Sequence, residues 1–122
     1  MRHAKRTDSN QASIVKDLRK AKFQVIVTNM GDDFPDLIAA FASHWVMLEI
    51  KKPDGDFTRG QLQFLADAGA PVGFATDTNE AAKMITCGYL RPAQKAEIAV
   101  WLVKNPDQQT LSVKKLRKLV NA

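Results

Sequence analysis

Three charged residues between positions 33 and 55 have the types and the spacing that metal-dependent hydrolysis uses. Asp36 stands at the head of one apolar run, and Glu49 and Lys51 stand at the tail of the next. Oxygen ligands from one or two carboxylates, completed by waters, suit Mg²⁺ or Mn²⁺. Such a metal activates a bound water and neutralises charge that builds on a phosphodiester. A neighbouring ammonium can stabilise the same charge, so these residue types suffice for phosphodiester hydrolysis.

A predicted hairpin must position these residues. Segments 36–41 and 45–51 are apolar and β-branched enough to be strands, joined by a short turn at 42–44. Side chains alternate between the two faces of a strand, so Glu49 and Lys51 project the same way. Whether Asp36 lies near Glu49 depends on the register, which the sequence leaves open. The alternative is that Glu49 and Lys51 form an exposed ion pair on a half-solvated strand, which contributes about 0–1 kcal/mol to stability.

The other segments predict an α/β sandwich. A helix is expected from Ser9 or Asn10 to about Lys22, behind a Ser or Asn cap and a polar, frayed start at residues 1–8. Strands are expected at 23–29 and 71–76, and helices at 59–69, 77–88, 92–104 and 110–120. Segment 52–58 is a turn-rich loop, and Thr58 is expected to cap the helix after it. This α-β-β-β-α-β-α order, followed by a helical pair, implies helices packed on a mixed sheet.

Composition is that of one globular domain. The 122 residues are 45% hydrophobic and 25% charged, enough for one core. Cys87 is the single cysteine, so no internal disulfide forms; we expect it to be buried in a protein of the reducing cytoplasm. No apolar run approaches the roughly 20 residues of a membrane span. The basic start is not followed by an apolar signal segment, and no membrane partner is expected.

Charge is distributed unevenly along the chain. Residues 1–22 carry seven Lys/Arg and two acids (+5), residues 23–90 carry four and nine (−5), and residues 91–122 carry seven and two (+5). An acidic middle between basic ends fits a central cation and a polyanion held by the flanks. Solvated lysine-rich helix faces explain the pattern equally well.

The spacing of Pro35-Asp36, twelve residues and Glu49-Ile50-Lys51 resembles the PD-(D/E)xK nuclease superfamily. Residues 9–86 are similar to the virus-type replication–repair nuclease (VRR-NUC) family and related small phage nucleases. The resemblance implies a restriction-endonuclease-like α-β-β-β-α-β core in residues 1–90, with residues 91–122 as a basic helical extension packed on the same domain. It also implies a phage-encoded protein in the cytoplasm of a bacterial host.

The resemblance assigns roles to the site residues. Asp36 and Glu49 would bind Mg²⁺ or Mn²⁺ together with the backbone carbonyl of Ile50, and Lys51 would be the catalytic lysine. Gln61 matches a recurrent glutamine that is expected to face the active site. The implied activity is that of an endodeoxyribonuclease, and a preference for duplex, branched or nicked DNA stays open, as does a homodimer.

One departure from the family pattern leaves a second function open. The family's first helix carries a glutamate before an "IV" pair, and Ser13 stands at that position here. Gln11 and Asp17 are polar and near but do not replace it convincingly. The alternative is therefore a nucleic-acid-binding protein on a nuclease fold that has lost efficient chemistry. A weaker third hypothesis is a protein-interaction module with an acidic partner.

Candidate DNA-binding residues flank the site loop and fill the last helix. Lys52 and Arg59 bracket the loop and would meet phosphates in a nuclease. The basic amphipathic pattern at 110–120 offers four further cations, against the alternative of a solvated face: Lys114, Lys115, Arg117 and Lys118. His44 is expected to be a turn residue and Trp45 a packed residue.

Overall fold

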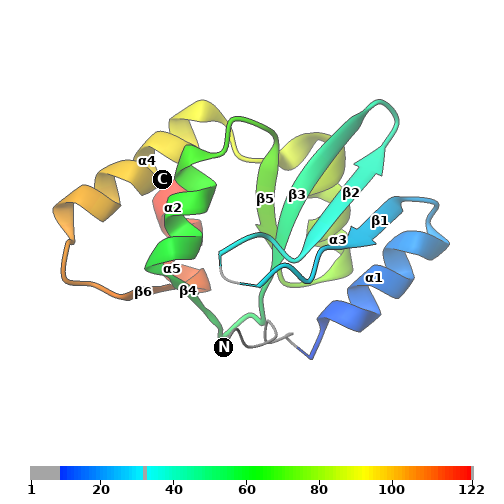
Figure 1. Cartoon of the computed structure of the whole chain (residues 1–122), viewed down its shortest axis with the longest axis horizontal. Helices are drawn as coiled ribbons and strands as arrows, with labels where there is room; N and C mark the ends of the chain where they lie inside the picture. The colour runs from blue at the N-terminus through cyan, green and yellow to red at the C-terminus, as the bar shows by residue number, and fades with distance from the viewer. Residues whose placement is uncertain (1–8, 32, 122) are drawn as a thin grey trace.

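The computed structural model describes residues 9–31 and 33–121 (Figure 1). The first half contains α1 (Gln11–Lys20), β1 (Gln24–Val27), β2 (Leu37–Phe41), β3 (His44–Ile50), β4 (Asp56–Thr58) and α2 (Arg59–Asp67). The second half contains β5 (Val72–Ala75), α3 (Thr78–Lys83), the π-helical turn η1 (Met84–Gly88), α4 (Pro92–Lys104), β6 (Thr110–Ser112) and α5 (Val113–Val120). The prediction about residues 1–8 concerns a segment outside the described residues.

The main sheet is mixed, as the sequence predicts. Its four strands lie in the order β1-β2-β3-β5, and the pairs β1-β2 and β2-β3 are antiparallel. Strand β5 pairs in parallel with β3, after the crossover through α2. The described chain is therefore an α/β protein with five α-helices and a mixed sheet.

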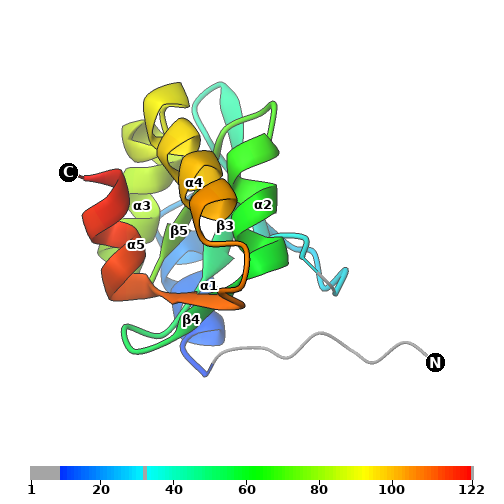
Figure 2. The same cartoon turned by 90° about the vertical axis from the view of Figure 1, so that its left-hand side faces the viewer.

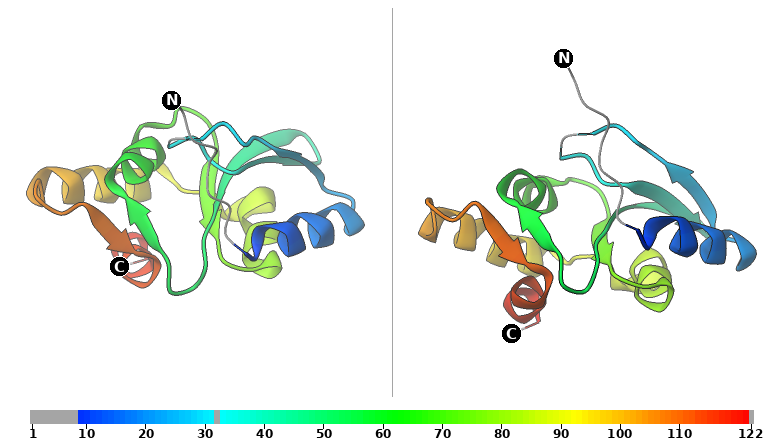
Figure 3. Two further views of the ribbon diagram at one scale, coloured as in Figure 1. Left: turned by 60° about the horizontal axis from the view of Figure 1, so that its bottom comes forward. Right: turned by 90° about the horizontal axis from the view of Figure 1, so that it is seen from below.

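Two apolar cores lie on opposite faces of this sheet. Strand β5 is buried along its whole length, and its side chains divide between the two cores: Ala75 belongs to the first, while Val72 and Phe74 belong to the second. The first core packs α1, α3 and η1 against β2 and β3. The second joins β5 to α2, α4 and α5. Figure 2 views the molecule from the side of α2, α4 and α5, and Figure 3 shows these three helices on one side of the sheet and α1 on the other.

The C-terminal segment differs from the prediction in one element. Residues Thr110–Ser112 form β6, not the first turn of a helix, and pair with β4 inside the segment predicted to be a loop. The physical reason is burial: Phe57 and Leu111 lie opposite each other in this ladder and both belong to the second core. Residues 91–122 therefore supply half of a core as well as a surface.

Four smaller expectations are also wrong. Cys87 lies exposed in η1. Trp45 is 44% exposed and belongs to neither apolar core. His44 is the first strand residue of β3 and not a turn residue, and its Nε2 lies 2.6 Å from the carbonyl oxygen of Ile85. Asn10 occupies the N-cap position of α1, but its side chain makes no capping hydrogen bond.

The helices carry no membrane signal. In residues 9–31 and 33–121, none combines the length and the hydropathy that a bilayer crossing requires.

Candidate active site

The β2-β3 register brings the two predicted carboxylates together. Leu37 pairs with Leu48, so Asp36 lies opposite Glu49 just before β2 begins. The backbone N–H of Asp36 donates to Glu49 Oε1 at 3.2 Å, and the N–H of Ile50 donates to Asp36 Oδ2 at 2.8 Å. Asp36 and Glu49 are 6% and 4% exposed. Each of the two side chains is thus held by a backbone N–H of the facing strand, that of Asp36 for Glu49 and that of Ile50 for Asp36, and both are buried at the end of the strand pair.

The loop before β2 fixes the backbone of Asp36. The N–H of Thr28 donates to the carbonyl of Asp36 at 3.0 Å. Gly31 has a φ of 72°, a left-handed conformation that glycine adopts without steric cost. The Phe34 ring then packs edge-on against Phe64 of α2, with 5.5 Å between the centroids. The loop is therefore anchored to β1 at one end and to α2 at the other.

Lys51 completes the cluster on the same sheet face as Glu49. Its Nζ lies 3.7 Å from Glu49 Oε2 and 5.2 Å from the centroid of the Phe57 ring. The side chain is only 13% exposed. Its backbone N–H donates to the carbonyl of Ala75. The ammonium is thus positioned between a carboxylate and an aromatic face.

Gln61 connects α2 to the carboxylate pair. Its Nε2 donates to Glu49 Oε2 at 2.7 Å. Its Oε1 accepts from the N–H of Thr58, while its own N–H donates to Thr58 Oγ1, which is a complete capping box. The cap fixes the χ angles of Gln61 and therefore aims its amide at Glu49. The predicted orientation of Gln61 toward the site agrees with this contact.

The donor set fits a magnesium-like cation. Within residues 9–31 and 33–121, no group of three or more His, Cys, Asp or Glu side chains could hold a metal. Two carboxylates plus waters are nevertheless what Mg²⁺ ordinarily takes from a protein. A carboxylate has about four acceptor positions, so the bonds that orient Asp36 and Glu49 are compatible with ligation. The N–H and C=O of one strand residue point to the same side; since the Ile50 N–H meets Asp36, its carbonyl faces that side too.

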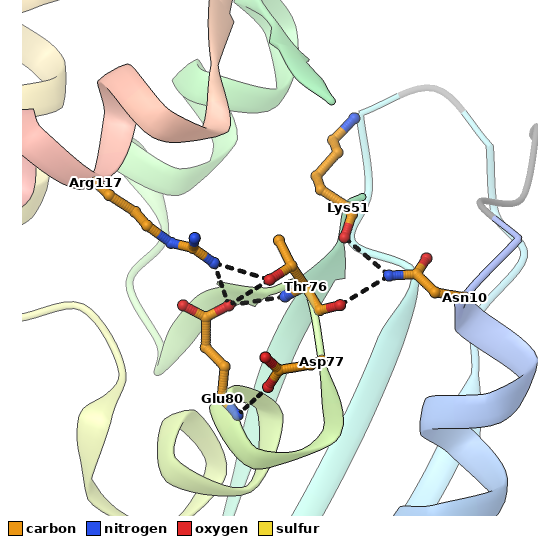
Figure 4. A network of polar contacts seen from close by, with 6 residues as sticks. All are labelled: Asn10, Lys51, Thr76, Asp77, Glu80 and Arg117. Atoms are coloured by element: carbon orange, nitrogen blue, oxygen red, sulfur yellow. Dashed lines mark hydrogen bonds and ion pairs between the residues drawn. The ribbon is translucent and has the colours of Figure 1, made fainter. Parts of the chain in front are cut away.

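A second polar network joins the ends of β3 and β5 beside this cluster (Figure 4). Asn10 Nδ2 donates to the carbonyls of Lys51 and Thr76, at 3.0 and 2.9 Å. The N–H of Thr76 donates to Glu80 Oε1 at 2.7 Å. Arg117 Nη2 of α5 donates to the same Glu80 oxygen at 2.6 Å and to Thr76 Oγ1 at 2.9 Å. Through Asn10, Glu80 and Arg117, helices α1, α3 and α5 are all connected to the ends of β3 and β5, where Lys51 and Thr76 lie.

The predicted DNA-binding residues fall into two groups. Arg59 donates to the carbonyls of Leu102, Asn105 and Gln108, and Arg117 takes part in the network just described, so both guanidinium groups have structural partners. The other four predicted DNA-binding residues are lysines whose side chains are exposed to solvent: Lys52, Lys114, Lys115 and Lys118.

Sequence reasoning missed the network residues. Asn10 was expected to cap a helix, and nothing in the local pattern links it to Thr76, which is sixty-six positions away. The structure also shows the surroundings of Ser13, which stands where the family pattern has a glutamate on the first helix. Ser13 is exposed, and Asp17 accepts a hydrogen bond from Thr78 Oγ1 of α3 at 3.0 Å, so that carboxylate faces the α1–α3 contact.

Comparisons with other proteins add no assignment. The chain matches no protein-family model, and comparisons with curated proteins and with solved structures returned no match.

Proposed function

We propose that this protein is a Mg²⁺- or Mn²⁺-dependent DNA endonuclease with a PD-(D/E)xK site. The observation that carries the proposal is the contact between Asp36 and Glu49 across the β2-β3 ends, with Lys51 beside them. These are the three side chains that the motif singles out. Asp36 faces Glu49 because of the β2-β3 register, and Lys51, two residues on from Glu49, lies on the same face of the sheet.

Each residue has a role that follows from its position. Asp36 and Glu49, with the Ile50 carbonyl, would hold the cation, which when bound supplies an activated water and neutralises phosphate charge. Gln61 and the Asp36 N–H keep the Glu49 carboxylate in one rotamer. Lys51, held 3.7 Å from Glu49, is placed to donate to a phosphate oxygen whose negative charge increases in the transition state.

DNA as the substrate is supported by charge. The acidic middle of the chain contains the site, and the flanking segments 1–22 and 91–122 each carry +5. Exposed lysines beside the site and on α5 are suited to phosphate contacts.

The test is a cleavage assay on duplex, flap and four-way-junction DNA with Mg²⁺ or Mn²⁺. Lys51→Ala should reduce the cleavage rate by about 10²–10³-fold, the usual loss on removing one charge-stabilising donor. Lys104→Ala, on an exposed lysine of α4, is the matched control and should keep the wild-type rate. Lys51→Met preserves the apolar stem, and its melting temperature separates lost chemistry from lost folding. Metal-dependent cleavage that survives in both Lys51 variants would refute the assignment.

A second candidate function is DNA binding without efficient hydrolysis. Ser13 is exposed on α1, and the nearest acid of that helix, Asp17, is engaged with Thr78. The first helix therefore offers the site no carboxylate. Salt-sensitive DNA binding that persists in Lys51→Ala, with no cleavage by the wild-type protein in either metal, would select this function.

A further inference from the structure

A groove of about 660 Å³ runs between α1 and the end of β1, outside the carboxylate cluster. Helix α1 contributes one whole face to it, and Val27 of β1 forms the opposite side. Three cations line the groove: Lys16, Arg19 and Lys20. Among the described residues that line the groove there is no acid, so these side chains present a single sign of charge to a ligand.

The positive charge is organised by the helix. Lys16 and Lys20 are one turn apart, about 6 Å along the helix axis, and both are exposed. Arg19 Nη2 donates to the Val25 carbonyl at 3.0 Å, which holds the guanidinium at the outer edge of β1 and leaves it four further N–H donors. The only acid of α1, Asp17, is turned to Thr78 on the other side. The groove is therefore built to bind an anion with several separated charges.

Between the cations the groove is apolar. Ala12 of α1 and Val27 of β1 line this part, and Val27 is 41% exposed although it belongs to a strand of the main sheet; Val15 also lines the groove but is only 6% exposed. A duplex presents its phosphates outward and keeps its base faces stacked inside. A single strand offers phosphates and unstacked base faces together, and single-strand sites combine a positively charged groove with side chains that contact the base faces, most often aromatic ones. Here the exposed aliphatic side chains of Ala12 and Val27 lie among the cations.

One end of the groove adjoins the proposed catalytic cluster. Gln11, which lines the groove, follows Asn10, whose amide holds the Lys51 carbonyl. Val27, on the opposite side, precedes Thr28, whose N–H donates to the carbonyl of Asp36. Both sides of the groove therefore adjoin residues whose hydrogen bonds reach the backbone of the site, at Lys51 and at Asp36.

We propose that the α1–β1 groove binds a single-stranded DNA segment that adjoins the bond to be cut. Lys16, Arg19 and Lys20 take the phosphates, and the exposed Ala12 and Val27 contact the bases. The inference rests on the proposed function in one respect, the choice of DNA as the polyanion. It specifies the substrate class as DNA that carries a single-stranded arm.

Binding measured without divalent metal tests the groove independently of cleavage. Fluorescence anisotropy in EDTA would follow a labelled twenty-residue oligothymidine and a blunt hairpin duplex. The groove variant is Lys16→Glu/Lys20→Glu. Its matched control, Lys83→Glu/Lys104→Glu, changes the net charge by the same amount at two exposed lysines of other helices, and circular dichroism checks that both variants fold.

The expected result is specific to the groove and to the single strand. The groove variant should bind oligothymidine at least tenfold more weakly, and its log–log salt slope should fall by about 1.4, since each phosphate contact contributes about 0.7 for single strands. The control should stay within twofold of wild type, and the hairpin should lose less than threefold. Equal losses in groove and control variants, equal losses for both DNAs, or no oligothymidine binding by wild type would overturn the inference.

Two further measurements distinguish single-strand binding by the groove from an acidic-peptide site and from the proposed nuclease function. Poly-glutamate that competes as well as oligothymidine at equal charge would make the groove an acidic-peptide site and overturn the assignment. Absence of metal-dependent cleavage, together with a groove-specific loss of binding, would refute the proposed nuclease function and support single-strand binding by the groove. Cleavage that needs Lys51, together with unaltered binding by the groove variant, would support the nuclease and overturn the groove.

Discussion

Replacing Gln61 with glutamate tests the contact that orients the carboxylate pair. The variant Gln61→Glu keeps an oxygen to accept from the Thr58 N–H, so the capping box survives. It replaces the amide donor, 2.7 Å from Glu49 Oε2, with a second carboxylate oxygen. Because Glu49 is 4% exposed, water cannot screen the new repulsion. The substitution is nearly isosteric, so its effect reports electrostatics and not volume.

The expected loss can be bounded from the geometry. A hydrogen bond to a charged group contributes about 1.5–3 kcal/mol, and two like charges about 4 Å apart repel by about 4 kcal/mol at an effective dielectric constant of about 20. A local rotation of the new side chain relieves part of that sum. We therefore expect a loss of about 2–4 kcal/mol in the free energy of unfolding. With an unfolding entropy of about 0.26 kcal/mol/K for a chain of this size, the melting temperature falls by about 8–16 °C.

Gln63→Glu is the matched control on the same helix. Gln63 Nε2 also donates to a carboxylate, that of Asp67 at 3.0 Å, but both residues are exposed. An exposed like-charge pair one turn apart costs about 0.2–0.5 kcal/mol, so its melting temperature should change by less than about 2 °C. Thermal unfolding followed by circular dichroism, without divalent metal, measures both. Equal small shifts in the two variants would refute the buried Gln61–Glu49 contact.

Two further substitutions test the supporting structure. Leu116→Ala in α5 leaves a cavity at a fully buried position of the second core and should lower the unfolding free energy, measured by urea titration, by about 2–5 kcal/mol. The control Val103→Ala changes a side chain of α4 that is 80% exposed and should alter the unfolding free energy by no more than about 0.5 kcal/mol. Similar values for the two variants would mean that α5 is not part of the core. Thr58→Ala removes the capping hydroxyl of α2 and should lower the unfolding free energy by about 1 kcal/mol. The control Ser13→Ala, at an exposed position of α1, should leave the unfolding free energy almost unchanged. An unchanged urea midpoint for Thr58→Ala would argue against the cap.

Much of the fold is encoded in local patterns. Helices α1 and α4 and the central strands follow from the pattern of apolar residues, because each places its apolar side chains in one of the two cores. Segment 110–112 could not be predicted in this way. Its strand exists only because Phe57, more than fifty residues earlier, provides the partner ladder opposite Leu111. Thr110 is β-branched and suits an extended conformation, so the helix predicted from position 110 in fact begins at Val113.

The supports of the site were equally hidden from sequence. Asn10 has the residue type and position of a helix cap, yet its amide serves the carbonyls of Lys51 and Thr76. Arg117 belongs to a basic helix that predicts phosphate contacts, yet its guanidinium meets Glu80. In both cases the residue type signals a polar partner, and only the tertiary fold determines which partner is within reach.

The convergence of the two carboxylates depends on a single residue in the hairpin turn. The sequence predicted a three-residue turn at 42–44, which would pair Phe41 with Trp45 and set Asp36, five positions before Phe41, opposite Ile50. The observed turn has two residues and pairs Phe41 with His44, so five positions on from His44 is Glu49. A slip of one residue turns every side chain of a strand to the other face. The burial of Leu37, Ala39, Val46 and Leu48 on the opposite face selects the two-residue turn, and the core thereby sets the geometry of the site.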